Sequence, residues 1–95
     1  MKMDFGDVIR AMKADPSKRF ARKGWNGKHM HIYLTPGRTI DAKDWNDPED
    51  LTGDEEEFGV VRILPHIDML AADGSRVIGW LASQTDMLAD DWVEV

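Results

Sequence analysis

The chain has 95 residues, no cysteine, four tryptophans and a formal net charge of −6 at pH 7. This length allows one compact domain, and the lack of cysteine excludes disulfides, thiolate nucleophiles, iron–sulfur clusters and cysteine-ligated zinc. With 42% hydrophobic and 32% charged residues, the chain is expected to be globular rather than disordered. A domain this small buries a modest share of its surface, so association with further copies would add buried area.

The sequence carries no sign of membrane insertion or secretion. No apolar run approaches the ~18 residues of a membrane-spanning helix, and polar residues interrupt the N-terminal segment too early for a signal peptide. The acidic balance also argues against broad binding of DNA, RNA or an anionic membrane, which needs an extended basic surface. We therefore expect a soluble cytoplasmic protein.

The charge is unevenly distributed along the chain. Residues 1–40 hold nine Lys or Arg against three acids, whereas residues 41–95 hold three against fifteen. Nine of those acids lie with a single lysine in residues 41–57, so the remaining residues carry a net charge of +2. This division is typical either of two halves that attract each other or of an anion-binding face. A pocket for a small phosphate-bearing ligand is compatible with it.

The first predicted element is a helix over residues 4–14. Asp4 is a suitable N-cap, and Pro16 ends the helix because the residue before a proline avoids the α region. Apolar residues recur at helical spacing, at Phe5, Val8, Ile9 and Met12.

A hairpin is predicted next. Asn26-Gly27 suits a two-residue type I′ turn, in which both central residues have positive φ. After the turn, Ile32 and its apolar neighbours alternate with His31 and Tyr33, which is typical of a half-buried strand over residues 30–34.

Residues 41–57 are predicted to form an acidic loop or flexible insertion. A calcium-binding loop is the alternative, but its spacing fails. The sixth position would be Glu49 or Glu55, where an EF-hand requires glycine.

The rest of the chain is predicted to be mainly strands. Asp73-Gly74 marks a second hairpin, and Ser83 caps a short helix. The predicted strands cover residues 58–64, 66–71, 76–80 and 92–95, and the helix covers 84–89. The fold class is therefore α+β: one small domain in which an antiparallel sheet packs against an N-terminal helix and a short C-terminal helix.

The inventory for catalysis is thin. The sequence has no nucleophile elbow, P-loop or dinucleotide fingerprint, so we assign no catalytic residue and no cofactor. His29 and His31 share one face of their strand, and His66 could join them to hold zinc. Because Tyr33 continues that face, a partly exposed polar surface is the preferred interpretation, and no metal site is assigned.

Two tryptophans lie where a ligand could reach them. Trp25 precedes the Asn-Gly turn and Trp80 ends a predicted strand. An indole at such a rim offers a flat face on which a base can stack. The cations close to Trp25 in sequence are Arg19, Arg22, Lys23 and Lys28. Aromatic and cationic groups together suit a nucleotide, through stacking on the base and charge for the pyrophosphate.

Several segments together resemble a known family. They are residues 5–8, the Arg-Lys-Gly-Trp-Asn-Gly run at 22–27, residues 32–34 and 65–69, and the Trp-Leu-Ala-Ser-Gln-Thr-Asp run at 80–86. The chain resembles the Thoeris anti-defence two family of small phage proteins over about residues 5–37 and 65–95. The acidic segment 41–57 contributes nothing to the match.

The resemblance implies a sponge rather than an enzyme. Members bind glycocyclic ADP-ribose, the signal of Thoeris immunity, and some also bind cyclic dinucleotides of CBASS, a second defence system, at a separate pocket. They assemble as homotetramers with pockets at subunit interfaces and act in the host bacterial cytoplasm during infection.

The resemblance also implies a set of ligand-binding residues. They are Phe5, Arg22, Trp25, Asn26, Lys28, Trp80, Gln84, Thr85 and Asp86. Trp25 and Trp80, together with Phe5, would sandwich or flank the adenine.

The charged and polar members of this set would bind the rest of the ligand. Arg22 or Lys28 would face the pyrophosphate, assisted by backbone amides of residues 84–86. Asn26 and Asp86 would bind ribose hydroxyls or the adenine edge. Leu81 and Leu88 are expected in the core.

A protein-interaction adaptor is the alternative function. In that case exposed aromatic residues and the acidic loop would bind a host protein. A thermal shift with a nucleotide would favour the sponge, and its absence together with capture of a host protein would favour the adaptor.

Overall fold

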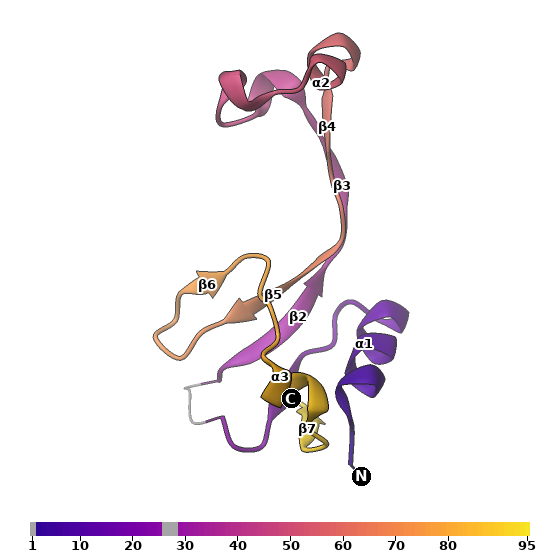
Figure 1. The fold of residues 1–95 in the computed structure, drawn as a ribbon, viewed down its shortest axis with the longest axis vertical. Helices are drawn as coiled ribbons and strands as arrows, with labels where there is room; N and C mark the ends of the chain where they lie inside the picture. Colours follow the sequence, from indigo (N-terminus) through magenta and orange to yellow (C-terminus); the bar gives the residue numbers. More distant parts are fainter. Residues whose placement is uncertain (1, 26–28) are drawn as a thin grey trace. The chain divides into compact units, whose positions relative to one another are not determined.

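The computed structural model describes residues 2–25 and 29–95. They form two compact units, each described here by itself (Figure 1). The sheet unit comprises the described part of residues 1–35 together with residues 66–95, and the acidic unit comprises residues 36–65. No helix among the described residues is long and apolar enough to cross a membrane.

The sheet unit contains a five-stranded antiparallel sheet with strand order β6-β5-β2-β1-β7. Its strands are β1 (Phe20–Arg22), β2 (His31–Thr35), β5 (His66–Leu70), β6 (Arg76–Val77) and β7 (Trp92–Glu94). The helices of this unit are α1 (Phe5–Ala14) and α3 (Gln84–Leu88). The predicted α+β class is therefore confirmed, as are the predicted helix near the N-terminus, the short helix after Ser83 and the terminal strand.

Helix α1 begins at a reciprocal capping box. The Asp4 carboxylate accepts a hydrogen bond from the backbone N–H of Asp7, and the Asp7 carboxylate accepts one from the N–H of Asp4. The helix ends before Asp15, whose extended backbone leads into Pro16. Both ends follow from the local sequence, because each cap satisfies backbone groups that the helix itself leaves unpaired.

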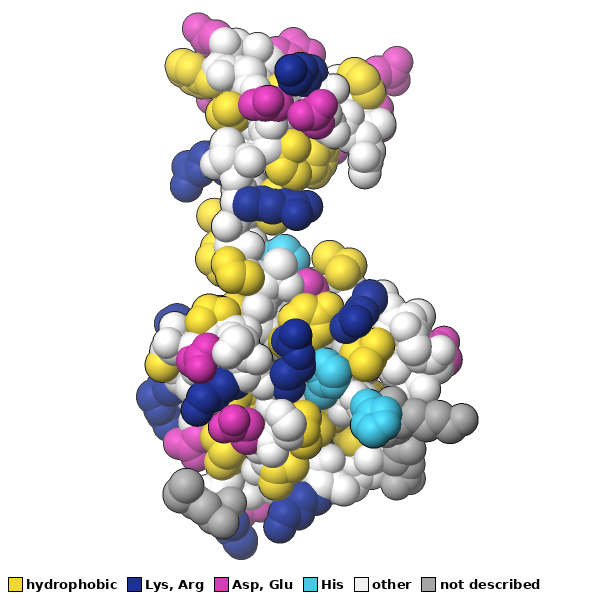
Figure 2. Space-filling view, turned by 180° about the vertical axis from the view of Figure 1, so that it is seen from behind, with side chains coloured by type: hydrophobic (Ala, Val, Ile, Leu, Met, Phe, Trp, Pro, Cys, Tyr) yellow, Lys and Arg dark blue, Asp and Glu magenta, His cyan; other side chains and the backbone are white. Residues whose placement is uncertain are grey.

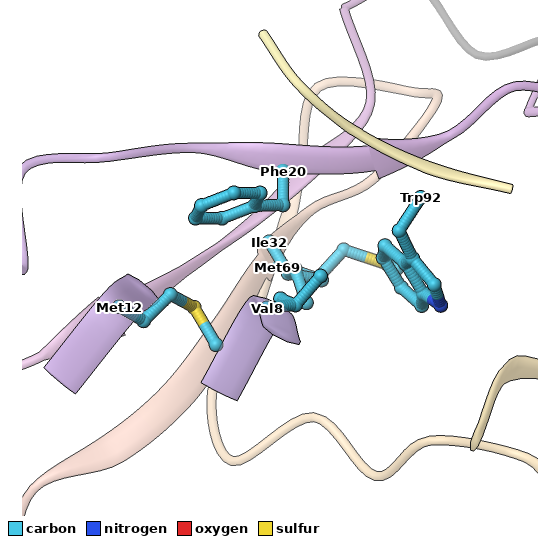
Figure 3. Close-up of a cluster of buried hydrophobic side chains, with 6 residues drawn as sticks. All are labelled: Val8, Met12, Phe20, Ile32, Met69 and Trp92. Carbon is cyan, nitrogen blue, oxygen red and sulfur yellow. The ribbon is translucent and has the colours of Figure 1, made fainter. Parts of the chain in front are cut away.

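One side of the sheet and α1 together enclose the core. Val8 and Met12 of α1 point at the strands and are almost fully buried (Figure 3). The core cluster contains Val8, Met12, Phe20, Ile32, Met69 and Trp92.

The first hairpin differs from the prediction. Strand β1 ends at Arg22, and Phe20 lies opposite Ile32. A two-residue turn at Asn26-Gly27 would have placed Phe20 opposite Tyr33, so the predicted register is wrong, although the antiparallel pairing is confirmed. Asn26 and Gly27 themselves lie outside the described residues.

The reason for this difference lies in the chain just after β1. The N–H of Trp25 donates to the carbonyl of Arg22 at 3.1 Å, which closes a turn directly after the strand. This turn carries the Trp25 ring to other aromatic side chains. The packing of Trp25 against these rings therefore outweighs the longer β1 strand that an Asn-Gly turn would favour.

The second hairpin is confirmed between β5 and β6. Gly74 has a φ of 88°, and the Asp73 carboxylate accepts hydrogen bonds from the N–H and hydroxyl of Ser75. Leu70 lies opposite Arg76, which leaves an odd number of residues in the loop. β6 is shorter than the predicted strand over 76–80, because the backbone turns after Val77.

The acidic unit is ordered into short elements, so the predicted loop over residues 41–57 is wrong. Strands β3 (Arg38–Asp41) and β4 (Val60–Ile63) pair antiparallel. Between them lie two 3-10 turns, η1 (Ala42–Asp44) and η2 (Pro48–Asp50), and helix α2 (Gly53–Phe58). Phe58 thus belongs to a helix and not to the predicted strand over 58–64.

Helix α2 forms because both of its ends are capped. Thr52 and Glu55 make a capping box, and Gly59 ends the helix in the left-handed region with a φ of 73°. Its three first-turn acids also lie at the positive end of the helix dipole. The high acid content, which favours a solvated loop, is here compatible with a helix N-terminus.

Candidate functional site

Four aromatic side chains from four parts of the sheet unit meet in one cluster. Phe5 is the first residue of α1, Trp25 follows β1, Trp80 precedes α3, and Trp92 begins β7. We call these residues the aromatic cluster. Three of them are site residues predicted from the sequence, and the fold brings these three together.

Trp92 lies at the centre of this cluster. Its ring centroid is 5.4 Å from that of Phe5 and 5.2 Å from that of Trp25. Trp92 is fully buried, and its Nε1 donates to the carbonyl of Asp86 at 3.0 Å. The central position of Trp92 was not predicted from the sequence, because Trp92 was assigned only to a terminal strand. The high number of tryptophans was the feature that could have indicated it.

Trp25 and Trp80 are half-buried and form a corner. Their ring centroids lie 6.2 Å apart, and their planes meet at 80°. Two rings that sandwich a base must be nearly parallel and leave a gap of about two stacking distances. In this arrangement the pair therefore does not form a sandwich, and the other expected arrangement, in which the two rings flank the adenine, stays a prediction. A base can instead stack on one indole and meet the other at its edge.

Arg22 connects three elements of the sheet unit. Its Nη1 donates to Asp86 Oδ1 at 3.0 Å, and its Nε donates to Asp91 Oδ1 at 2.9 Å. A second bond joins Nη2 to Asp91 Oδ2 at 3.3 Å. β1 is thereby tied to α3 and to the start of β7. Because both carboxylates already neutralise Arg22, its geometry suits positioning of the cluster better than capture of a pyrophosphate.

The two carboxylates that pair with Arg22 both have lowered pKa values. The hydrogen bond from Arg22 lowers the pKa of Asp91 below its ordinary value. For Asp86, burial is the largest effect and raises the pKa, but the hydrogen bonds from Arg22 and Ser83 together outweigh it, so the pKa is lowered. Both acids are therefore ionised at neutral pH.

The other predicted site residues fall into two groups. Gln84 and Thr85 are exposed in the first turn of α3, next to the capping box of Ser83 and Asp86. Asn26 and Lys28 lie outside the described residues, so their assignment stays a prediction. Asp86 forms the capping box with Ser83, and its carboxylate also pairs with Arg22. Its carboxylate oxygens therefore already have partners within the protein.

A small cavity of about 150 Å³ opens beside Trp92. It is lined by Lys2, Lys23, Asp90, Asp91 and Trp92. Lys2 pairs with Asp90 at 3.5 Å. The expected clustering of cations near Trp25 is thus only partly met, because Arg19 stacks instead over Tyr33, at 4.7 Å from the ring centroid.

The histidines do not converge. β2 and β5 place His31 opposite Leu70 and His66 opposite Thr35. His66 Nε2 lies 3.3 Å from Asp68, and His31 Nδ1 lies 2.6 Å from the carbonyl of His29. Among the described residues, no group of three His, Asp or Glu side chains is arranged to hold a metal ion.

Leu81 and Leu88 were expected in the core and are instead exposed, at 89% and 82%. Helix α3 has five residues and directs its Asp86 toward Arg22, so Leu88, two residues further along the helix, points to the solvent. Ile78 is also 69% exposed. These side chains give the segment around α3 an apolar surface.

Comparison with known proteins identifies a family for this chain. A family model described as a Thoeris anti-defense 2-like domain matches residues 3–95. The chain is 31% identical over 91 residues to Thoeris anti-defense 2 of Bacillus phage SP01, covering 96% of this chain and 92% of that protein. The match includes the segments that carry every described member of the aromatic cluster. The chain therefore belongs to the Thoeris anti-defense 2 family.

Proposed function

We propose that this protein is a sponge that sequesters a glycocyclic ADP-ribose signal of Thoeris immunity without cleaving it. Membership of the family supports a phage anti-defence role. In the proposed mechanism, each occupied site removes one signal molecule in the host cytoplasm, so the downstream effector stays inactive. Such a protein must be abundant and must bind the signal more tightly than the effector does, by mass action.

The aromatic cluster is the observation that carries this proposal. Phe5, Trp25 and Trp80 remain half-buried around the fully buried Trp92. A core-only role would bury all four rings, whereas a stacking site needs ring surface that a ligand can reach. We propose that adenine stacks on Trp25 or Trp80 and contacts the other at its edge.

The polar part of the ligand would lie beside this corner. Gln84 and Thr85 are exposed in the first turn of α3, which follows Trp80 in the chain, and they can donate or accept hydrogen bonds. Lys23 is exposed and lines the cavity beside Trp92. Lys28 stays the proposed pyrophosphate ligand, with Lys23 as a second cation. Arg22 holds α3 and β7 in place, and a rigid site lowers the entropy that binding must overcome.

The proposal includes assembly of several copies, with each site completed at an interface. The exposed Ile78, Leu81 and Leu88 support it, because large apolar side chains left exposed within one short segment are typical of an interface between proteins. Light scattering after size exclusion tests this part: a tetramer is expected, and Leu81→Asp together with Leu88→Asp should reduce it to smaller species.

Calorimetric titration tests the proposed ligand. Glycocyclic ADP-ribose isomers and cyclic dinucleotides are titrated separately into the intact protein. We expect binding of at least one glycocyclic ADP-ribose isomer, and Trp25→Ala or Trp80→Ala should weaken it by roughly tenfold or more, because stacking on an aromatic ring contributes about 1–3 kcal/mol. Trp45→Ala, in the acidic unit, is the matched control and should bind like the wild type.

The same titration separates the other outcomes. Binding of cyclic dinucleotides alone would indicate a CBASS sponge, and binding of both classes would indicate two pockets. No binding, together with capture of a host protein, would favour the adaptor function. Ligand released by heat denaturation should be chemically intact; a hydrolysed product would overturn the sponge proposal in favour of an enzyme.

A further inference from the structure

The face of the sheet opposite α1 carries a second, different set of side chains. Phe20 and Ile32 point toward α1, so the alternation of side chains along a strand places Arg19, His31 and Tyr33 on the opposite face. Arg76 of β6 lies opposite Leu70 of β5, on that same face. Figure 2 shows Lys or Arg and His side chains together on this unit, among hydrophobic ones.

Two guanidinium groups share one tyrosine ring on this face. The Arg19 guanidinium carbon lies 4.7 Å from the centroid of the Tyr33 ring, and that of Arg76 lies 5.5 Å from it. Arg76 Nη1 is also 3.4 Å from the Tyr33 hydroxyl. Cation–π contact keeps both side chains against the sheet, which reduces the entropy lost when they bind a ligand.

Neither guanidinium is neutralised by a carboxylate of the described residues. No ion pair within 4.0 Å joins Arg19 or Arg76 to an acid there. The acid opposite Tyr33 is Asp68, which is 3% exposed and accepts hydrogen bonds from Thr35 and from the N–H of Gly79. Arg22 offers the contrast, because two carboxylates pair with its guanidinium. The opposite face therefore keeps two positive charges for an external anion.

A cavity of about 350 Å³ lies beside Arg19. It is lined by Arg19, His29, Met30, His31 and Val95. Nδ1 of His31 must carry a proton, because it bonds the carbonyl of His29 at 2.6 Å, and this leaves Nε2 for a ligand. His29 holds a φ of 66°, a left-handed conformation that residues other than glycine rarely adopt. The size is within the range of pockets for small molecules.

We propose that this cavity binds a small phosphate ester, with the phosphate held by Arg19 and His31 and by Arg76 across the Tyr33 ring. A guanidinium matches phosphate oxygens with paired N–H groups, and in its doubly protonated form the His31 imidazole adds a further donor at Nε2. Met30 and Val95, which also line the cavity, provide apolar surface for the organic part of the ligand. The site lies on the other side of the sheet from the aromatic cluster, and it does not rest on the proposed function.

The chain contains its own reporter for this site. Tyr33 is the only tyrosine in the sequence. Trp25, Trp80 and Trp92 belong to the aromatic cluster, and Trp45 lies in the acidic unit. Nuclear magnetic resonance on protein with labelled tyrosine rings and labelled indole nitrogens therefore distinguishes the two faces of the sheet in one titration.

The test adds pyrophosphate, adenosine monophosphate and adenosine to the intact protein. Both phosphate compounds should shift the Tyr33 signals saturably. Pyrophosphate, which has no base, should leave the tryptophan signals in place, and adenosine should not shift the Tyr33 signals. Arg19→Ala and Arg76→Ala should each weaken binding roughly tenfold, since a hydrogen bond to a charged group contributes about a factor of ten or more. Higher salt should weaken it further.

Matched variants control for charge and folding. Lys13→Ala removes an exposed cation from α1 and should bind like the wild type. Arg19→Lys keeps the charge and loses the paired donors, so its affinity should lie between wild type and Arg19→Ala. Unchanged affinity of the double variant Arg19→Ala with Arg76→Ala would overturn the proposal. So would Tyr33 signals that stay unmoved at millimolar pyrophosphate, or shifts confined to the tryptophans.

Discussion

The two units of the chain are stabilised in different ways. Seven of the eight buried hydrophobic residues identified among the described residues lie in the sheet unit, and the acidic unit contributes only Val61. The acidic unit holds three basic and nine acidic residues, a net charge of −6, which equals that of the whole chain and leaves the sheet unit balanced. Packing fixes side chains in the sheet unit, whereas local hydrogen bonds and caps define the acidic unit.

This difference assigns separate tasks to the two units. Aromatic rings and ion pairs that must be held at defined distances need a packed support, and the sheet unit supplies it. A two-stranded ribbon is at best marginally stable by itself in water, and the acidic unit depends on its capped turns. We therefore expect ligand binding to reside in the sheet unit, and substitutions in the two units to have unequal effects.

The largest effect is expected from Trp92→Ala. Trp92 is fully buried, contacts Phe5 and Trp25, and donates a hydrogen bond to Asp86. Removing so large a buried side chain should lower the free energy of unfolding by about 3–5 kcal/mol. Urea denaturation followed by circular dichroism measures this.

Trp45→Ala is the control for the comparison of units. Trp45 is half-buried in the acidic unit, and its Nε1 reaches Asp50 at 3.3 Å. Its loss should change the unfolding of the sheet unit little. Equal losses for Trp92→Ala and Trp45→Ala would show that the two units fold as one cooperative body.

The next effect concerns Arg22 and depends on pH. Arg22→Met leaves Asp86 and Asp91 without their partner, so the variant should be less stable than the wild type at pH 7. Both acids have a pKa lowered from the ordinary 3.8. A lowered pKa in the folded state adds stability above the ordinary value, and this stability is lost as the pH falls through the folded value.

The difference between wild type and Arg22→Met should therefore be full at pH 7 and shrink below about pH 4. Thermal unfolding across this range measures it. Arg10→Met, which removes an exposed pair with Asp7, is the matched control and should have a smaller effect at pH 7. A constant difference down to pH 2 would show that Arg22 contributes by packing alone.

The sequence predicted well those features that neighbouring residues determine. The N-caps of α1 at Asp4 and of α3 at Ser83 and the Asp73-Gly74 hairpin each depend on residues close in the chain. The convergence of Phe5, Trp25 and Trp80 was expected from family resemblance, and not from the residues themselves. Its geometry was not predictable, because Trp25 packs against Trp80 and Trp92, which are both distant from it in sequence.

Other features depend on residues that are distant in sequence. Arg22 or Lys28 was expected to face the pyrophosphate, which stays a prediction, and nothing near Arg22 in sequence indicates that its guanidinium pairs with Asp86 and Asp91. The acidic segment was expected to be a loop because of its composition. Thr52 and Gly59, which cap α2, show that two well-placed residues can outweigh a high acid content.

A smaller and local effect is expected from Gly59→Ala. Gly59 ends α2 with a φ of 73°, and no atom within 4 Å would obstruct an added methyl group. The penalty is therefore conformational alone, about 1–2 kcal/mol for a residue with a side chain in the left-handed region. Hydrogen exchange should be faster for the amides of α2 and unchanged for those of β2 and β5. Gly53→Ala, at the other end of α2 with φ outside that region, is the matched control.

The smallest effect on the sheet unit should come from replacing the whole acidic unit. Thr35 and His66 lie directly opposite each other where β2 ends and β5 begins, so a short Asn-Gly turn can join the two strands in place of residues 36–65. All seven buried hydrophobic residues of the sheet unit remain, and its charge stays balanced. Binding to a glycocyclic ADP-ribose isomer that the wild type binds should therefore change by less than about twofold, within the error of titration, since no residue of the proposed site is removed. If the shortened chain folds with its native circular dichroism but no longer binds, the acidic unit supplies part of the ligand site, and the division of tasks between the units is wrong.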